Sequence, residues 1–332
     1  MGSELLVVDG LKKWFPFKTG FIKSKQAKAV DGISFDVKKG EIFGLVGESG
    51  CGKTTTGKVI LRLIEKTAGS VFLKGEDVFA LKRKQLRETR QMMQMIFQNP
   101  YEVLEARLTV SRLLSEPLEF HDLAGNEGEN RDKITEALHN VDLEPPEEFV
   151  SKRPFELSGG QLQRIAIARA LILQPEFIVA DEPVSMLDVS IRAGVLKLLN
   201  RLRKELGLTY LFITHDLAIS KFVCDRLAVM YLGKIVEMGP SVDLLDEPLH
   251  PYTRALRAAT PSLNQEHGNH DILSNLIGGE IPSAMNIPQG CRFHPRCPYA
   301  AQLCKNVEPS LREFGKGRYV ACHYAENLQS QS

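Results

Sequence analysis

The sequence predicts an α/β protein whose parallel sheet is covered by helices, followed by a small cysteine-rich C-terminal domain. Three observations support this fold class. Short apolar runs typical of buried strands alternate with helical stretches. A glycine-rich turn directly follows one of these strands and opens a helix. After about residue 260 the composition changes: Asn, Pro, Gly and Cys become frequent, and long periodic segments end.

Strand-like runs dominate the first 90 residues. Their alternating or continuous apolar character fits sheet strands. We expect such strands at 5–8, 33–37, 41–46 and 70–73. The glycine-rich turn follows the third of them, and a helical pattern then runs from about 52 to 64.

The middle of the chain predicts helices first and then further strands. Residues 100–160 have a mostly helical pattern, with a polar loop at 123–130. A helix after residue 160 ends near 173, because the following proline cannot continue it. Two buried strands, 177–180 and 210–213, then flank a helix at 190–206. Such strand–helix alternation indicates a parallel sheet.

The overall composition limits the class of protein. The chain has 332 residues, of which 43% are apolar and 25% charged, as in soluble globular proteins. Its formal net charge is +1, which gives no indication of nucleic-acid binding. No apolar run reaches the roughly 18–20 residues of a membrane span, and the start lacks a basic signal-peptide flank. We therefore expect a cytoplasmic protein that reaches a membrane only through a partner.

The segment from Gly47 to Thr54 reads G-E-S-G-C-G-K-T, a full match to the phosphate-binding pattern G-x-x-x-x-G-K-T. Its glycines let consecutive N–H groups surround phosphate oxygens at a helix N-terminus. The Lys53 ammonium would reach the terminal phosphates, and the Thr54 hydroxyl would hold Mg²⁺. The strand before the segment and the helix after it make a chance glycine turn a poor alternative.

A second chemical feature is the acidic pair that ends the apolar run 177–180. Acidic residues at the carboxyl edge of a parallel sheet open onto its ligand crevice. Asp181 would bind Mg²⁺ directly or through water, and Glu182 would orient and deprotonate an attacking water molecule. Alone, such a pair is usually a solvated turn; together with the phosphate loop it predicts nucleotide hydrolysis.

A third motif narrows the predicted nucleotide binding to one kind of ATPase. Leu157 is followed by the trans-nucleotide signature Ser158, Gly159, Gly160 and Gln161, a sequence that resembles the signature of the ABC ATPases. A bare S-G-G is more often only a helix cap, but here it occurs with the phosphate loop and the acidic pair. The resemblance implies that the signature contacts ATP bound on a second subunit.

Other elements of that family are matched by single residues. Gln98 resembles the Q-loop glutamine, which senses Mg²⁺ and water, and His215 resembles the switch histidine at the γ-phosphate. An aromatic residue should stack on adenine; the pattern favours Phe15 and leaves Trp14 as a rival. The resemblance implies Mg²⁺ ligands Thr54, Gln98 and Asp181. It implies nucleotide contacts from Phe15, Gly47, Ser49, Gly50, Cys51, Gly52, Lys53, Thr54 and Thr55.

Four further segments narrow the resemblance to the oligopeptide and dipeptide importer ATPases. They are P-F-E at 154–156, E-P-V-S at 182–185, H-P-Y-T at 250–253 and G-C-R-F-H-P-R-C-P at 290–298. The implied fold is a RecA-like P-loop core with an antiparallel β subdomain and a helical signature subdomain at about 99–164. The ATPase domain would span 1–260, and the cysteine-rich C-terminal domain 261–332.

The resemblance also implies partners. They are a second, related ABC ATPase subunit in a heterodimer, two transmembrane permease subunits and an extracellular solute-binding protein. We expect no nucleic-acid partner, and a peripheral location on the cytoplasmic side of the cell membrane. The sequence leaves the solute open among peptides, nickel complexes and sugars. A soluble ABC ATPase acting on ribosomes or DNA is the rival class; it is disfavoured because this chain has one cassette and no basic stripe.

Cys291, Cys297, Cys304 and Cys322 lie in one short stretch with spacing C-x5-C-x6-C-x17-C. Zinc sites usually pair ligands two to four residues apart, so this is a poor zinc pattern. Four thiolates on an irregular loop can hold a [4Fe–4S] cluster, and the resemblance implies that ligand set. Zinc, with His294 or His323 substituting for a cysteine, and free thiols stay open. A metal here would order the C-terminal domain, and we expect its loss to loosen that domain while leaving ATP binding by the core largely intact.

Overall fold

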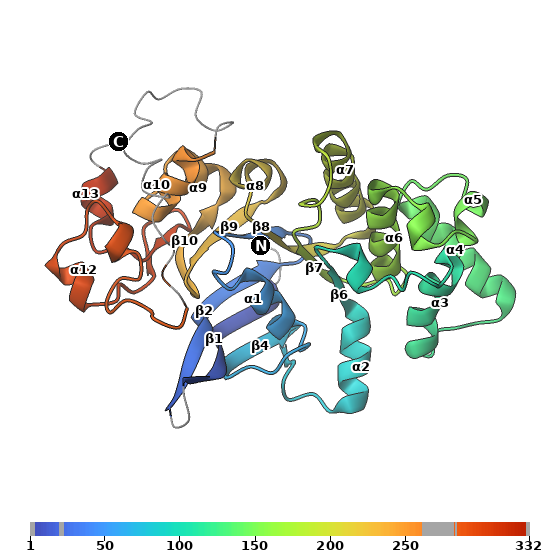
Figure 1. The fold of residues 1–332 in the computed structure, drawn as a ribbon, viewed down its shortest axis with the longest axis horizontal. Coiled ribbons are helices and arrows are strands. Elements are labelled where there is room, and N and C mark those ends of the chain that lie inside the picture. Colours follow the sequence, from blue (N-terminus) through green and yellow to red (C-terminus); the bar gives the residue numbers. More distant parts are fainter. Residues whose placement is uncertain (1–3, 20–22, 261–281, 283, 330–332) are drawn as a thin grey trace. The chain divides into compact units, whose positions relative to one another are not determined.

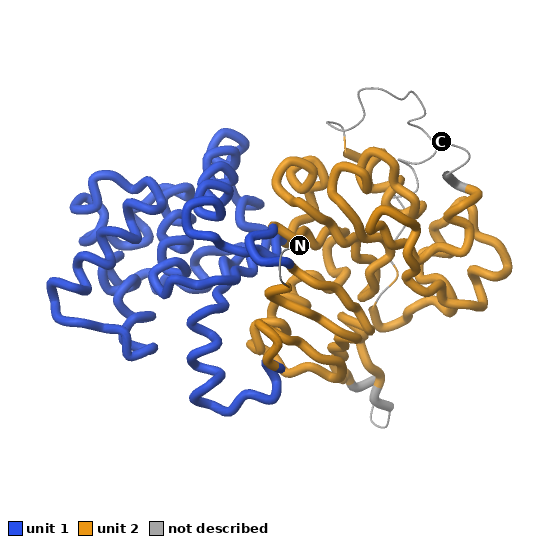
Figure 2. Tube along the Cα trace, turned by 180° about the vertical axis from the view of Figure 1, so that it is seen from behind, with its two compact units in different colours: residues 1–3, 38–41, 77–212 blue, residues 4–37, 42–76, 213–332 orange. Residues whose placement is uncertain are grey.

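The computed structural model describes residues 4–19, 23–260, 282 and 284–329, and all structural statements refer to these residues (Figure 1). The chain forms two compact units. Unit 1 contains residues 38–41 and 77–212, and unit 2 contains 4–37, 42–76 and 213–329 (Figure 2). The predicted domain boundary at 260 adjoins residues 261–281, which lie outside the described part.

Unit 1 is built on three strands in the order β8-β7-β6. These are β6 (Met93–Ile96), β7 (Phe177–Asp181) and β8 (Thr209–Thr214). β6 and β7 are parallel, with Ile96 opposite Ala180. Every residue of β7 and β8 is buried, in agreement with the continuous apolar runs that predicted them.

Helices make up most of the rest of unit 1. They are α2 (Arg83–Met92), α3 (Val110–Phe120), α4 (Glu127–Asn140), α5 (Glu147–Val150), α6 (Gly159–Leu171) and α7 (Val189–Leu206), with 3-10 turns at Pro100–Glu102 and Pro154–Glu156. α7 starts one residue before the predicted position and ends where expected, because Gly207 adopts the left-handed conformation that terminates helices.

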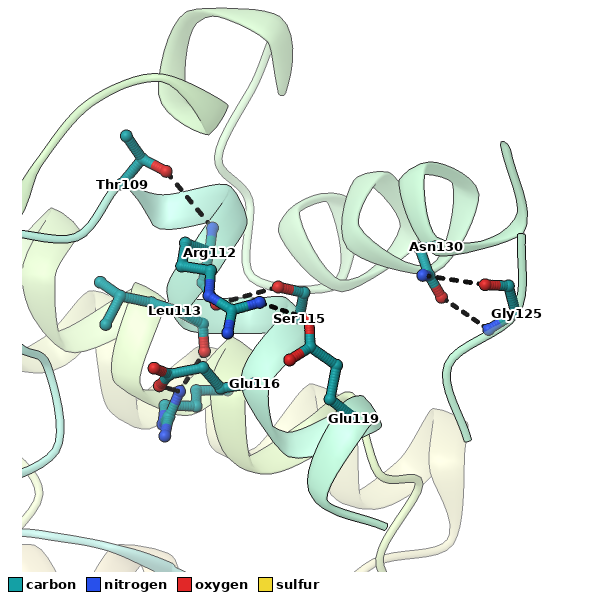
Figure 3. Close-up of polar contacts among 9 residues, drawn as sticks. Thr109, Arg112, Leu113, Ser115, Glu116, Glu119, Gly125 and Asn130 are labelled. Carbon is teal, nitrogen blue, oxygen red and sulfur yellow. Dashed lines mark hydrogen bonds and ion pairs between the residues drawn. The ribbon is translucent and has the colours of Figure 1, made fainter. Parts of the chain in front are cut away.

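Polar contacts fix the start and the flank of α3 (Figure 3). The Thr109 hydroxyl accepts the N–H of Arg112 over 3.3 Å and caps the helix. From α6, Arg169 donates to the Leu113 carbonyl and to Glu116, the latter over 3.2 Å. This partly buried guanidinium therefore connects α6 to α3, which lies in the segment predicted to be helical.

Unit 2 contains two sheets. One has the order β2-β1-β4 and is formed by β1 (Glu4–Thr19), β2 (Lys23–Lys38) and β4 (Ala68–Leu73), with β1 and β4 antiparallel. The two-residue strand β5 (Glu76–Asp77) follows β4. β1 and β2 are far longer than the apolar runs 5–8 and 33–37, because backbone pairing continues through their polar residues. The predicted antiparallel β region is thus present.

The second sheet has the order β11-β12-β10-β9-β3 within unit 2. Its strands are β3 (Ile42–Val46), β9 (Arg226–Tyr231), β10 (Lys234–Pro240), β11 (Arg312–Glu313) and β12 (Tyr319–Val320). β3 and β9 are parallel, and β10 and β12 are antiparallel. Strands from the cysteine-bearing end of the chain therefore extend the sheet that contains β3.

Helices of unit 2 are short. They are α1 (Lys53–Ile60), α8 (Leu217–Val223), α9 (Ser241–Asp246), α10 (Pro251–Ala258), α12 (Gln302–Asn306) and α13 (Ala325–Gln329), with a 3-10 turn, η4, at His294–Arg296. α1 ends four residues before the predicted end at 64, since Arg62 adopts a left-handed conformation. Among the described helices, none is long and apolar enough to cross a membrane.

Candidate active site

The phosphate-loop segment connects β3 to α1 in unit 2. Two of its glycines have no room for a side chain. A Cβ on Gly47 would lie 2.2 Å from the Met230 carbonyl oxygen, and one on Gly52 would lie 2.0 Å from that of Ala29. Both also have positive φ, 154° and 112° respectively. The tight turn that the motif predicts therefore requires glycine at these two positions.

Lys53 is buried and its ammonium points back into the loop. Its Nζ donates to the carbonyl oxygens of Gly47 and Glu48 over 2.7 and 3.0 Å. The Cys51 thiol lies 3.9 Å away, and burial raises its pKa, so it stays protonated at neutral pH. Cys51 thus acts as a small buried filler, while Thr54 and Thr55 in the first turn of α1 are partly exposed.

The acidic pair lies at the carboxyl end of β7 in unit 1. Asp181 is buried, whereas Glu182 is partly exposed and adopts a positive φ of 46°. Gln98 lies two residues beyond Ile96, just as Glu182 lies two beyond its partner Ala180. The Gln98 amide consequently donates to Oε2 of Glu182 over 3.0 Å. Parallel pairing of β6 and β7 brings these two sequence-predicted residues together.

The signature residues form the start of α6. The Ser158 hydroxyl accepts the N–H of Gln161 over 3.3 Å, and the Gln161 side chain accepts the N–H of Ser158 over 3.0 Å. This reciprocal pair is a capping box. Ser158 and Gly159 are exposed, and Gly160 packs so closely on Ile191 that a Cβ would lie 2.7 Å from it. The exposed residues are thus accessible to a ligand outside this chain.

His215 follows β8 and its side chain is exposed. The next residue, Asp216, caps α8 by accepting the N–H of Ile219 over 3.1 Å. This cap fixes where the histidine leaves the strand.

The two candidate adenine contacts differ in environment. Phe15 is 40% exposed, and the Lys13 ammonium lies 4.8 Å from its ring centre. Trp14 donates its indole N–H to Oδ1 of Asp31 over 2.9 Å and is partly buried. Of the two residues, Phe15 is exposed by the larger fraction of its surface.

All four C-terminal cysteines line one small pocket of unit 2, with a volume of about 20 Å³. Burial, reinforced by the neighbouring thiols, raises the pKa of Cys291 to about 11 and of Cys297 to about 12. Burial also raises the pKa of Cys322. Such thiols stay protonated at neutral pH unless a cation compensates the thiolate charge.

Two histidines line the same pocket. Nδ1 of His294 lies 2.9 Å from the Cys291 carbonyl oxygen, and Nε2 of His323 lies 3.0 Å from that of Val307. Among the described residues, no group of three or more His, Cys, Asp or Glu side chains is arranged to hold a metal ion.

Sequence reasoning missed two residues next to the phosphate loop. Tyr252 accepts the N–H of Glu48 over 3.0 Å, and Arg296 forms an ion pair with the Glu48 carboxylate. Both belong to motifs that the sequence had singled out, H-P-Y-T and G-C-R-F-H-P-R-C-P. Their position at the loop had no local signal, because they are more than 200 residues away along the chain.

Comparisons with known proteins agree with this arrangement. Residues 30–185 match the family model "ABC transporter", and residues 236–304 match "Oligopeptide/dipeptide transporter, C-terminal region". The chain is 45% identical over 324 residues to the oligopeptide transport ATP-binding protein AppF of Bacillus subtilis, with 97% of each chain covered. It is 48% identical over 328 residues to the putative oligopeptide transport ATP-binding protein YkfD of the same organism, covering 98% of this chain and 97% of YkfD.

Solved structures are similar as well. The dimeric ATP-binding cassette MJ0796, in a post-hydrolysis state bound to ADP and Pi, is 29% identical with a TM-score of 0.62, covering 71% of this chain and 98% of that one. CbiO1 from Clostridium perfringens is 27% identical with a TM-score of 0.63, and the match covers 74% of this chain and 91% of CbiO1. The chain therefore belongs to the ABC transporter family and shares the C-terminal region of its oligopeptide/dipeptide transporters.

Proposed function

We propose that this chain is the ATP-hydrolysing subunit of an ABC importer that takes up di- and oligopeptides, working at the cytoplasmic side of the cell membrane. One observation carries the choice of solute. Residues 236–304, beyond the phosphate loop and the acidic pair, match the oligopeptide/dipeptide transporter region. Relatives named for oligopeptide transport also cover nearly the whole chain. The alternative solutes, nickel complexes and sugars, have no comparable support.

A transport assay tests this proposal. The chain is purified with its permease and partner ATPase, reconstituted in vesicles, and supplied with peptide-loaded binding protein. We expect ATP-dependent uptake of labelled di- or oligopeptides and none with Lys53→Ala. Uptake of a nickel complex or a sugar but not of peptides would refute the choice of solute. A chain that binds ribosomes or DNA and no permease would refute the importer.

The acidic pair, Asp181 and Glu182, supports the proposal that this chain hydrolyses ATP. Gln98 holds the Glu182 carboxylate, which we propose as the group that orients and deprotonates the attacking water. Asp181, Gln98 and Thr54 carry oxygen atoms suited to Mg²⁺, which would neutralise phosphate charge when bound. His215 is proposed as the γ-phosphate contact from its match to the family's switch histidine.

The Lys53 ammonium in the phosphate loop supports the proposal that this loop binds nucleotide. In the structure, the Lys53 ammonium is satisfied by two loop carbonyl groups. We propose that, when ATP binds, phosphate oxygens replace these carbonyl groups as acceptors for the Lys53 ammonium. The loop N–H groups from Gly47 to Thr55 would donate to the same phosphates. Adenine would stack on Phe15, the more exposed of the two aromatic candidates.

The exposed signature supports the assembly. Because Ser158 and Gly159 are exposed at the start of α6, they are accessible to ATP held by another subunit. We propose that this subunit is a related but different ATPase, so that the pair is a heterodimer. Two permease subunits and, through them, an extracellular solute-binding protein complete the importer.

The proposal of a structural metal centre rests on the four cysteines that line one pocket and on the family resemblance, although in the described residues these side chains are not arranged around a metal ion. We propose a [4Fe–4S] cluster held by the four thiolates that line it, with zinc as the alternative. When bound, the cluster would supply metal–thiolate bonds that order a small region with little core of its own. In this proposal residues 1–260 form the ATPase domain and 261–332 the C-terminal domain, part of which lies outside the described residues.

A further inference from the structure

Glu48, the second residue of the phosphate loop, forms a two-bond ion pair with Arg296. Nη1 of Arg296 lies 2.9 Å from Oε2, and Nη2 lies 3.1 Å from Oε1. The two side chains are only 5% and 13% exposed. Arg296 ends η4, immediately before Cys297. A residue of the cysteine-bearing segment is thus paired directly with the loop expected to hold the phosphates.

The backbone of Glu48 is held at two more points. Its N–H donates to the Tyr252 hydroxyl over 3.0 Å, and its carbonyl accepts from the Lys53 ammonium over 3.0 Å. The carboxylate, the N–H and the carbonyl of this one residue all have defined partners. Because Glu48 lies between the loop glycines Gly47 and Gly50, whose backbone has little stiffness of its own, these contacts determine where the loop backbone lies.

Two of the groups that hold Glu48, the Tyr252 hydroxyl and the Arg296 guanidinium, belong to one cluster built around the Phe293 ring. The Phe293 ring centre is 5.4 Å from those of both Tyr231 and Tyr252. The Arg296 guanidinium lies 5.8 Å from the Phe293 ring centre and 5.9 Å from that of Tyr231. His250 caps α10 by accepting the N–H of Tyr252 over 3.0 Å. The motifs at 250–253 and 290–298 therefore meet, and both reach the same loop residue.

The charges explain why such a contact matters. A carboxylate beside a triphosphate repels it, unless a cation compensates the charge and fixes its direction. Arginine does both, because its planar fork binds a carboxylate through two parallel hydrogen bonds. Breaking a buried pair of this kind leaves one charge uncompensated, which is strongly unfavourable.

We infer that Arg296 is a positioning residue for ATP binding: through Glu48 it makes the geometry of the phosphate loop depend on the fold of the cysteine-bearing segment. This rests on the proposal that residues 47–54 bind the ATP phosphates. The cysteine-bearing segment then contributes to nucleotide affinity as well as to stability.

The test measures the Kd for Mg·ATP on the full chain by equilibrium titration. Arg296→Ala should weaken binding roughly tenfold, in the range of coupling between contacting residues. Since Arg296 acts through Glu48, adding Arg296→Ala to Glu48→Gln should change Kd by less than about twofold. Arg296→Lys keeps the charge without the two-bond geometry, so it should fall between wild type and Arg296→Ala.

Arg292→Ala is the matched control. Arg292 lies four residues earlier, is equally buried at 5% exposed, and pairs with Asp31 and the Leu232 carbonyl instead of the loop. It should lower thermal stability and leave Kd within about twofold of wild type. Amide exchange at Glu48–Gly52 should accelerate in Arg296→Ala and not in Arg292→Ala.

Three outcomes would overturn the inference. The first is an unchanged Kd in Arg296→Ala. The second is that Arg296→Ala weakens ATP binding as much in the Glu48→Gln background as in wild type. The third is that Arg292→Ala weakens ATP binding as much as Arg296→Ala does. If Arg296→Ala does not fold, Arg296→Lys with wild-type Kd and wild-type amide exchange overturns it equally. Failure of the underlying proposal looks different: Lys53→Ala would then bind ATP normally.

Discussion

The side-chain amide of Gln98 donates a hydrogen bond to the carboxylate of Glu182 over 3.0 Å, and this bond joins the ends of two paired strands. The Glu182 carbonyl is also an acceptor, for the Ser185 hydroxyl over 3.1 Å. Side chain and backbone are thus both held, although Glu182 itself has a positive φ. A fixed carboxylate at the end of a buried strand suits a general base, which must meet its water molecule in one orientation.

Glu182→Gln should retain ATP binding and lose turnover by about 10²-fold or more, because an amide cannot accept the proton of the attacking water. ATPase assays and nucleotide titrations measure the two effects separately. Glu176→Gln is a matched control, since Glu176 lies just before the opposite end of β7 and pairs with Lys39; it should hydrolyse ATP at the wild-type rate. Hydrolysis near wild type in Glu182→Gln would exclude Glu182 as the base.

The purified chain alone should be mostly monomeric, with weak ATPase activity, because its exposed signature residues are proposed to serve a site on another subunit. Light scattering and ATPase assays check this. Adding the partner ATPase and the permease should raise turnover, and peptide-loaded binding protein should raise it further. A chain that is fully active alone and indifferent to membrane partners would contradict the proposed assembly.

His250 predicts a measurable loss of stability in acid. Burial lowers its pKa to about 3, so the folded chain keeps it neutral while the unfolded chain protonates it below about pH 6.5. The unfolding free energy should therefore fall as pH drops from 6.5 towards 3. Above pH 7, His250 should add nothing to the pH dependence of the unfolding free energy. His250→Asn can still cap α10. Between pH 7 and 5, wild type should lose about 2 kcal/mol more than this variant in urea unfolding; equal losses would refute the assignment.

The helices and strands around the acidic pair were predictable because each is encoded by a local sequence pattern. The buried strands at Phe177–Asp181 and Thr209–Thr214 show as apolar runs, and the helix Val189–Leu206 shows as a periodic pattern that ends at glycine. The family resemblance identified Gln98 and Glu182 separately; their proximity is a structural finding whose physical cause is the parallel register of β6 and β7.

What the sequence could not predict depends on pairing between distant segments. β1 and β2 extend well beyond their apolar runs because backbone hydrogen bonds do not require apolar side chains. The Arg296–Glu48 pair joins residues 248 positions apart, and neither residue type indicates its partner. The shared pocket of the four cysteines was expected only through the family resemblance, because no local pattern encodes how an irregular loop folds.

Protein purified without oxygen should be brown, absorb broadly near about 400 nm and carry about four irons per chain, if the four thiolates hold a [4Fe–4S] cluster. Metal analysis and absorption spectra measure this. The control is Cys224→Ser, since Cys224 is buried in the core away from the four-cysteine pocket; it should keep the colour, while Cys304→Ser should lose it. Stoichiometric zinc without iron would replace the cluster by the zinc alternative and leave the ATPase assignment unaffected.

Cys297→Ser should also weaken ATP binding, contrary to the expectation from sequence that the core would bind ATP independently of the C-terminal domain. Cys297 directly follows Arg296, so losing the metal bond proposed for Cys297 should loosen the turn that carries the guanidinium paired with Glu48. The size of the loss should approach that of Arg296→Ala, and combining the two substitutions should add little, since both release the same carboxylate. Nucleotide titration of the anaerobically purified single and double variants measures this. Full ATP affinity in a bleached Cys297→Ser protein would show that the Arg296–Glu48 pair survives without the proposed metal, with Arg296 held by the aromatic cluster around Phe293.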